Sequence, residues 1–225
     1  MENKKEIKGC IFDLDGLLLD TELIYAEALQ EFLDVVSPGK KYTLDLKLKI
    51  MGASPEVGAL VLIKELELPF TTEEFLTKRK PILHSKFPEC KAMPGAEKLI
   101  EHLHKNKIPI AIATSSAKET FGLKTKKHKF IELVDEIITS DKIKNSKPDP
   151  EIFLLAAKNL NLSPAECLVF EDSLNGVAAG INGGFPVIHV PDPELDLSLR
   201  QKLPAQTLSS LLDFDPTFWN LPSYN

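Results

Sequence analysis

The sequence has little cysteine, a single tryptophan and no excess of positive charge among its 225 residues. Cys10, Cys90 and Cys167 are an odd number of widely spaced residues without a Cys-x-x-Cys pair. A chain of this length does not need disulfide bonds to be stable, so a disulfide framework is not indicated. We therefore expect free thiols and a reducing, cytoplasmic location.

Positive residues are outnumbered, with 27 Lys and Arg against 33 Asp and Glu and a formal net charge of -6. This balance gives no broad positive field to hold a nucleic-acid backbone or an anionic membrane, so neither is an expected partner. A small anionic substrate is still compatible with it, because a few local cations and a metal ion can overcome a weak negative field.

Long hydrophobic runs are also missing. No stretch approaches the roughly 20 apolar residues that span a bilayer, and the segment from Met1 to Lys8 is polar, unlike a secretory signal. Hydrophobic residues make up 43% and charged residues 27% of the chain, a composition that excludes disorder and predicts a globular protein with a sizeable core.

Five short apolar runs predict buried β-strands. They are Gly9–Phe12, Ile108–Ala113, Leu133–Ile138, Cys167–Phe170 and Phe185–Val190. Helical patterns separate the later runs, for example after Pro94-Gly95 and after Pro150. The alternation predicts an α/β fold with a Rossmann-like, doubly wound parallel sheet, in which ligands bind beyond the carboxyl ends of the strands.

Residues 17–90 interrupt this alternation, because they contain helix-like segments and no convincing strand. The segments are Leu23–Leu33, Leu44–Met51, Glu56–Leu66 and Thr72–Ser85. We predict that residues 17–90 form an all-helical cap domain, inserted after the first strand into a catalytic core formed by residues 1–16 and 91–225. The two crossings between cap and core would act as hinges.

The first predicted strand ends in Phe12-Asp13-Leu14-Asp15-Gly16. Two carboxylates two residues apart can project toward one place, while Gly16 frees the chain to turn. A lone Asp-x-Asp often represents surface acids, so the assignment of Asp13 and Asp15 to a site depends on signals at other strand ends.

The second predicted core strand is followed by Thr114, Ser115 and Ser116. Their hydroxyl and backbone N–H groups suit a phosphate or an oxyanion. Ser116 is equally typical of a helix N-cap, because Ala117-Lys118-Glu119 could begin a helix.

Two further signals are Lys147-Pro148-Asp149-Pro150 and the acids Glu171 and Asp172. The prolines restrict the backbone around one cation, although an isolated loop lysine is usually solvated. Glu171 and Asp172 directly follow a predicted buried strand, where they could also cap the next helix. The coincidence of four strand or loop ends favours a site.

In this order, Asp-x-Asp-Gly, Thr-Ser, Lys-Pro-Asp-Pro and Glu-Asp-Ser-x-x-Gly resemble the haloacid dehalogenase superfamily of phosphotransferases over nearly the whole chain. Leu17 to Glu22 resembles the subgroup with a helical cap at this point. Met93–Leu99, Leu123–Thr125 and Leu221–Tyr224 are similar to its phosphatases of pseudouridine 5′-phosphate and glycerol phosphates. The segment Ser140–Ser146 is shorter than in those relatives, but we expect Lys147 still to reach the site.

The resemblance implies that Asp13 is the nucleophile and that Asp15 is the general acid and base. Two unit charges of like sign about 4 Å apart repel by roughly 4 kcal/mol at an effective dielectric constant of 20, so attack on a phosphate requires cations. The implied Mg²⁺ ligands are Asp13, the Asp15 main-chain carbonyl, Asp172 and, as a further candidate, Glu171. The implied phosphate-binding groups are Thr114, the Ser115 N–H and Lys147.

The implied function is a Mg²⁺-dependent phosphomonoesterase acting on a small phosphorylated metabolite, with pseudouridine 5′-phosphate as the first candidate. The alternatives are a glycerol-phosphate or sugar-phosphate phosphatase, a phosphomutase on the same core, and a non-catalytic binding protein. Asp15 argues against a dehalogenase, since a carbon–halogen substrate has no leaving oxygen to protonate. We expect a monomer.

Three other features are weaker candidates. His102 and His104 lie two apart on a predicted helix and so on different faces, which disfavours a metal pair. The basic run Lys124–Lys129 predicts a solvated helix face rather than an anion site. Met51-Gly52 is either a substrate-facing turn or the end of a cap helix.

Overall fold

The computed structural model describes residues 6–50 and 55–224 and contains a six-stranded parallel sheet, with strand order β5-β4-β1-β6-β7-β8. The strands are β1 (Gly9–Phe12), β4 (Ile110–Ala113), β5 (Glu136–Ile138), β6 (Cys167–Glu171), β7 (Val187–His189) and β8 (Gln206–Thr207). The chain adds β4 and β5 on one side of β1 and then crosses over to add β6, β7 and β8 on the other. Such a reversal places a ligand crevice at the carboxyl end of the sheet, beside β1.

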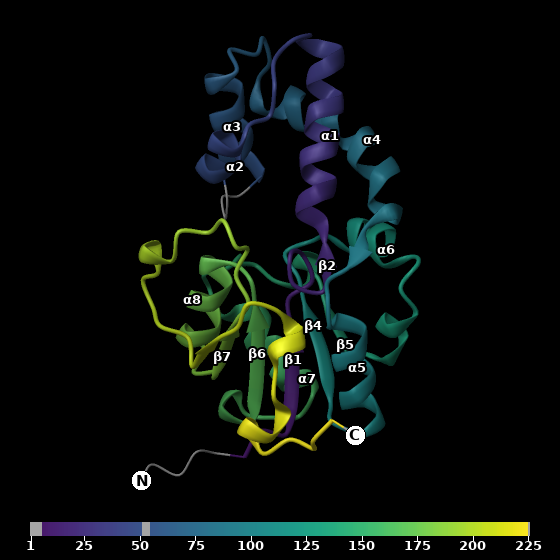
Figure 1. Cartoon of the computed structure of the whole chain (residues 1–225), viewed down its shortest axis with the longest axis vertical. Helices are drawn as coiled ribbons and strands as arrows, with labels where there is room; N and C mark the ends of the chain where they lie inside the picture. The colour runs from purple at the N-terminus through teal and green to yellow at the C-terminus, as the bar shows by residue number, and fades with distance from the viewer. Residues whose placement is uncertain (1–5, 51–54, 225) are drawn as a thin grey trace.

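Helices cover both faces of the sheet (Figure 1). They are α5 (Ala96–Lys105), α7 (Glu151–Asn159) and α8 (Leu174–Asn182), whereas α6 (Lys118–Thr125) lies beyond the upper end of the strands in the figure. Successive residues of a strand point to opposite faces, so Phe12 packs in one apolar layer with α5 and Ile11 packs in the other with α7 and α8. Every residue of β1 is buried, as expected for a central parallel strand.

Four helices form a separate body at one end of the molecule, above the sheet in Figure 1. They are α1 (Thr21–Val36), α2 (Leu44–Ile50), α3 (Pro55–Glu65) and α4 (Thr72–Lys86). Their apolar faces share a core that includes Leu33, Leu62 and Phe75. A capping box between Thr71 and Glu74 begins α4, and a short 3₁₀ helix, η1 (Phe87–Glu89), follows it.

The two crossings between this helical body and the sheet lie side by side. Strand β2 (Leu19–Asp20) pairs antiparallel with β3 (Lys91–Ala92), and the Met93 N–H donates to the Leu18 carbonyl at 2.9 Å. Asp20 then caps α1 by accepting a hydrogen bond from the Leu23 N–H at 3.3 Å. The entry and exit of the insert are therefore joined in one short ribbon.

The predicted fold class, a doubly wound parallel sheet with a helical insert, is confirmed. All five predicted core strands are present, although β4, β5 and β7 are shorter than the apolar runs that predicted them. The expectation of no strand in residues 17–90 is wrong, because β2 lies there. The domain boundaries near residues 16 and 90 stay a prediction.

The structure describes the two histidines considered as a metal pair but not the turn predicted at Met51-Gly52. His102 Nε2 contacts the Pro222 carbonyl at 2.8 Å, whereas His104 Nδ1 contacts the Leu133 carbonyl at 3.2 Å, so the two rings have different neighbours. Met51-Gly52 lies outside the described residues. In the described part of the chain, no helix combines the length and the apolar character needed to cross a membrane.

Candidate active site

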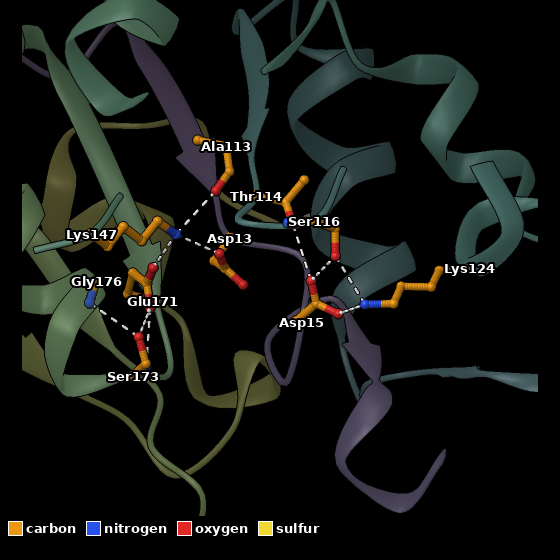
Figure 2. A network of polar contacts seen from close by, with 10 residues as sticks. All are labelled: Asp13, Asp15, Ala113, Thr114, Ser116, Lys124, Lys147, Glu171, Ser173 and Gly176. Carbon is orange, nitrogen blue, oxygen red and sulfur yellow. Dashed lines mark hydrogen bonds and ion pairs between the residues drawn. The ribbon is translucent and has the colours of Figure 1, made fainter. Parts of the chain in front are cut away.

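The polar residues predicted from the sequence gather at the carboxyl end of the sheet (Figure 2). Asp13 follows β1, Thr114 follows β4 and Glu171 ends β6. Because β1 pairs with β4 on one side and with β6 on the other, these three strand ends are adjacent. Lys147 joins them from the loop before α7, although it is 134 positions from Asp13 in sequence.

Lys147 is a buried cation between two buried acids. Its Nζ lies 2.5 Å from Asp13 Oδ1 and 2.5 Å from Glu171 Oε1, and it also donates to the Ala113 carbonyl at 3.1 Å. The side chain of Lys147 is 6% exposed, that of Asp13 8% and that of Glu171 0%. Lys147 therefore reaches the site despite the short approach to it.

Burial and the neighbouring charges have opposite effects on the pKa values of Asp13 and Lys147. Burial raises the pKa of Asp13, the positive charge of Lys147 lowers it, and the neighbouring acids Glu171 and Asp15 raise it again, to about 7. Burial lowers the pKa of Lys147, but Asp13 and Glu171 outweigh that effect and hold it above its ordinary value. The lysine therefore stays charged at neutral pH.

Glu171 is held by the start of α8 as well as by Lys147. Its Oε2 accepts hydrogen bonds from the Ser173 N–H and hydroxyl, both at 3.0 Å. Ser173 is the N-cap of α8 and accepts from the Gly176 N–H at 3.1 Å. Because both carboxylate oxygens of Glu171 are engaged by protein donors, the arrangement favours support of Lys147 over direct metal ligation.

Asp15 points away from Asp13, toward α6 (Figure 2). Its Oδ2 accepts from Thr114 Oγ1 at 3.0 Å and from Ser116 Oγ at 2.9 Å, and its Oδ1 is paired with Lys124 Nζ. Burial raises the pKa of Asp15, but Lys124 and the two hydroxyl donors outweigh it, so the pKa lies below the ordinary value. The observed contacts therefore favour the ionised carboxylate.

The prediction of a solvated face for the basic run is wrong at Lys124, whose side chain is 0% exposed. Helix α6 buries Phe121 and Lys124, three positions apart and so on one face, while Lys127 lies beyond its end and pairs with Glu89 at the surface. The spacing from Phe121 was the available signal. Because most other residues of the run are also basic, charge alone did not distinguish Lys124, which is buried, from the exposed lysines.

The three hydroxyl residues after β4, Thr114, Ser115 and Ser116, have different surroundings. Thr114 Oγ1 is engaged twice, donating to Asp15 and accepting from the Ser116 N–H at 3.0 Å. Ser115 is exposed, and no hydrogen bond from its N–H to another described residue competes with a ligand. The N-cap alternative for Ser116 is wrong, because α6 begins at Lys118, whose N–H donates to Asp141 Oδ2 at 2.6 Å.

Asp172 lies beside the cluster on the loop after β6. Burial raises its pKa well above the ordinary value, the charges of Glu171 and Asp13 raise it further, and Lys147 opposes them. Its carbonyl contacts His189 Nε2 at 2.8 Å, and its carboxylate faces the backbone of Gly16. Asp172 is thus held close to the turn that follows Asp15.

The residues present fit a magnesium ion. Among the described residues no group of three or more His, Cys, Asp or Glu side chains is arranged to hold a metal by itself. Mg²⁺ does not need such a group, because it usually binds one or two carboxylates together with water and substrate phosphate. Asp13 and Asp172 supply two carboxylates, and burial first, with the neighbouring acids adding to it, raises the pKa of each, so a bound cation would stabilise their ionised forms.

A cavity of about 210 Å³ adjoins Asp172 and Gly16. Its wall includes the apolar side chains of Leu17, Met93, Pro94, Val190, Pro191, Pro193 and Leu211. The acids Asp20 and Glu22 also face it, so it is better suited to an uncharged organic group than to a phosphate.

Comparison with known proteins agrees with this geometry. The model of the haloacid dehalogenase-like hydrolase family matches residues 10–190. The chain belongs to this family, so the resemblance inferred from the sequence motifs is confirmed. The predicted enzyme class, phosphoric monoester hydrolase, is confirmed as well.

Individual relatives are similar along almost their whole length. A Drosophila melanogaster protein named probable pseudouridine-5′-phosphatase is 39% identical over 100% of this chain and 99% of that protein. The (DL)-glycerol-3-phosphatase 2 of Arabidopsis thaliana is 40% identical over 97% of this chain and 93% of its own. A crystal structure of a Deinococcus radiodurans HAD family hydrolase with bound phosphate and sodium has the same fold, with a TM-score of 0.81, 23% identity and coverage of 97% and 99%.

Proposed function

We propose that this protein is a Mg²⁺-dependent phosphomonoesterase that works through an aspartyl-phosphate intermediate. One observation carries the proposal: the buried carboxylate of Asp13 lies 2.5 Å from the buried ammonium of Lys147, and a second acid, Asp15, follows two residues later. A nucleophile, a fixed cation and a separate proton carrier are the groups that phosphoryl transfer requires.

In the first step Asp13 attacks phosphorus through Oδ2, the oxygen that Lys147 does not engage. A bond forms between that oxygen and phosphorus, and the ester P–O bond breaks. Because Asp15 is ionised in the free protein, it takes up the proton of the monoanionic phosphate ester when the substrate binds and then gives that proton to the departing alkoxide. Lys147 and the Ser115 N–H stabilise charge on the phosphoryl oxygens, and Thr114 joins them once its hydroxyl proton turns from Asp15 to the phosphoryl group.

In the second step Asp15 takes a proton from water as that water attacks phosphorus. The bond between phosphorus and Asp13 breaks, and inorganic phosphate leaves with the proton that Asp15 took from water, so both carboxyl groups return to their starting states. Asp13, Asp172 and the Asp15 main-chain carbonyl would hold Mg²⁺, which supplies positive charge that offsets repulsion between the nucleophile and the phosphate.

The substrate we propose is a small phosphorylated metabolite, with pseudouridine 5′-phosphate first. Its support is the likeness to the Drosophila protein over the whole chain. Glycerol phosphate is the second candidate, because the Arabidopsis relative is similar to the same extent. A sugar-phosphate phosphatase, a phosphomutase and a non-catalytic binding protein are the remaining alternatives, and one assay separates them by the preferred substrate, by the product and by the absence of turnover.

The test is release of inorganic phosphate by the purified protein, with Mg²⁺ and with EDTA, from pseudouridine and uridine 5′-phosphates, glycerol phosphates and hexose phosphates. Asp13→Asn should lower kcat by roughly 1,000-fold or more, as loss of a nucleophile does. Asp34→Asn, at an exposed carboxylate of α1, is the control.

Unchanged phosphate release by Asp13→Asn would overturn the mechanism. Isomerised sugar phosphate without net phosphate release would indicate a phosphomutase, and binding without turnover would indicate a binding protein. A higher kcat/KM for glycerol phosphate than for pseudouridine 5′-phosphate would overturn the proposed substrate but not the proposed reaction.

The cytoplasmic location and the monomeric state are part of the proposal. Cys10, Cys90 and Cys167 are all buried free thiols, which suits a reducing compartment. Light scattering coupled to size-exclusion chromatography tests the monomer, for which a mass near 25.0 kDa is expected.

A further inference from the structure

Lys124 is a buried cation that the reaction described above does not use. Lysine is almost never fully buried unless its charge is paired. Here Nζ pairs with Asp15 Oδ1 and also donates to Ser116 Oγ at 2.9 Å and to the Tyr25 hydroxyl at 3.2 Å. These three contacts use all three ammonium protons, so the position of Nζ is fully determined.

Two groups around Lys124 come from the helical insert rather than from the sheet domain. Tyr25 lies on α1, one turn after the helix leaves β2, and Phe87 lies in η1, just before the chain returns through β3. Lys124 Nζ lies 5.2 Å from the centre of the Tyr25 ring and 4.6 Å from that of Phe87, within the range of cation–π attraction. The two rings meet edge to face at 5.7 Å.

These contacts join the acid–base carboxylate to the cap hinge. Asp15 is held by Lys124 on one oxygen and by Thr114 and Ser116 on the other, and in Figure 2 it faces this group rather than Asp13. Lys124 in turn is held by Tyr25 and Phe87 at both ends of the insert. The direction in which the Asp15 carboxylate points therefore depends on where those two rings lie.

We propose that Lys124 is a positioning residue for Asp15, and that Tyr25 and Phe87 make this positioning depend on the cap. The inference rests on the proposed function, because it concerns the acid and base of the same reaction. Misplacing a reacting group by about 1 Å can cost on the order of 100-fold in rate. Lys124 acts through Asp15 and does not itself touch the substrate.

The test uses the leaving group to separate positioning from general loss of structure. p-Nitrophenolate departs without a proton, so its release in the first turnover does not depend on Asp15, whereas an alkoxide must be protonated. The alkyl substrate is the phosphate ester hydrolysed fastest in the assay of the previous subsection. Asp15→Asn defines the full effect of losing the acid and base.

Lys124→Met should lower kcat for the alkyl ester by roughly 10- to 100-fold, with little change in KM or in the first-turnover burst of p-nitrophenol. Tyr25→Phe keeps the ring and removes one hydrogen bond, so the same loss should be smaller, roughly three- to tenfold. It is the informative variant if Lys124→Met does not fold. Lys127→Met, at an exposed lysine paired with Glu89, should leave both rates unchanged.

Equal losses for both esters in the Lys124 and Tyr25 variants would overturn the positioning role, as would no loss in either. If Asp15→Asn itself shows no difference between the two esters, the proposed function fails instead. The two failures are therefore distinguishable in one set of measurements.

Discussion

Gly16 sets how closely the turn after Asp15 can approach Asp172. Its φ is +81°, in the left-handed region that a side chain disfavours. A Cβ at this position would lie 2.2 Å from Asp172 Oδ2 and 3.0 Å from its Cγ. The absence of a side chain at Gly16 is thus what allows the Asp172 carboxylate, on the loop after β6, to lie against the turn that follows β1.

We expect Gly16→Ala to reduce activity by displacing the Asp172 carboxylate. Gly39→Ala is a matched control, because Gly39 also has a positive φ, +93°, but a Cβ there meets nothing within 4 Å. Both variants should lose about 1–2 kcal/mol of stability from backbone strain, measured by urea unfolding. Only Gly16→Ala should lose Mg²⁺-dependent activity, and equal activities in the two variants would contradict the assignment of Asp172.

The raised pKa of Asp172 predicts a pH dependence of stability in EDTA. The ordinary pKa is 3.8, and the folded protein holds the proton to higher pH. The folded state therefore binds more protons than the unfolded state above about pH 4, and its free energy of unfolding falls as pH rises. The coupled carboxyl Asp13, with a pKa of about 7, extends this window to neutral pH.

Asp172→Asn should remove part of the decrease in the free energy of unfolding as pH rises. Each unit by which the pKa of Asp172 differs between the folded and unfolded states contributes about 1.4 kcal/mol to that decrease. The stability of the variant relative to the unsubstituted protein should therefore increase from pH 4 to pH 7 in chemical unfolding experiments. Added Mg²⁺ should stabilise the unsubstituted protein more than the variant. A stability difference that is independent of pH would show that Asp172 is not destabilised by burial.

At the scale of secondary structure, α8 is the element that fixes the acidic side of the site. Ser173 caps it, Glu171 binds Ser173, and Gly176 packs directly against the Glu171 carboxylate. A Cβ on Gly176 would lie 1.8 Å from Glu171 Oε1, so the helix could not keep its position beside β6. The small residue here is required by the site rather than by the helix.

Gly176→Ala should therefore destabilise the protein and lower its activity, despite alanine's higher helix propensity. Gly122→Ala on α6 is the control, since a Cβ there meets nothing within 4 Å and alanine should add up to about 1 kcal/mol of stability. Thermal unfolding and kcat of the two variants give the comparison. A stabilised, fully active Gly176→Ala would contradict the described packing.

The sequence predicted those parts of the fold in which several consecutive apolar residues form one buried strand. Apolar runs predict β1 and β6, and the parallel sheet then requires that Asp13 and Glu171 at their ends be neighbours. Strands β2, β3 and β8 have two residues each, too few to produce a pattern. The inward turn of Lys124 depends on Asp15 and Tyr25, about 100 positions away in sequence, so no local pattern of charge could predict it.

At the scale of the whole molecule, ion pairs tie the cap to the sheet domain in more than one place: Lys80 pairs with Glu119, Glu89 pairs with Lys127, and a third group lies at α2. Lys47 on α2 lies 3.0 Å from Asp192 and 2.6 Å from Glu194, both on the segment that follows β7. Such partly exposed pairs contribute at most about 1 kcal/mol each. That is little for global stability but enough to shift the position of a hinged body several-fold between two states.

We expect Lys47→Met to broaden the range of cap positions and Lys49→Met to leave it unchanged, because the acids that pair with Lys49 among the described residues, Asp45 and Glu65, both lie inside the cap. Spin labels at cysteines introduced in place of Val35 and Leu203, which are 76% and 83% exposed, report the distance distribution. The native cysteines are buried and should not react. Identical distributions for both variants would show that the Lys47 pairs do not hold the cap.

The pairing of β2 with β3 has a consequence for how this chain could have been assembled. Because Leu19 lies opposite Ala92, everything between them leaves and re-enters the sheet domain at one point. An element inserted at such a point displaces none of the surrounding backbone. Replacement of the helical body would therefore leave the sheet domain in place, but a replacement would have to supply contacts to Lys124 like those of Tyr25 and Phe87.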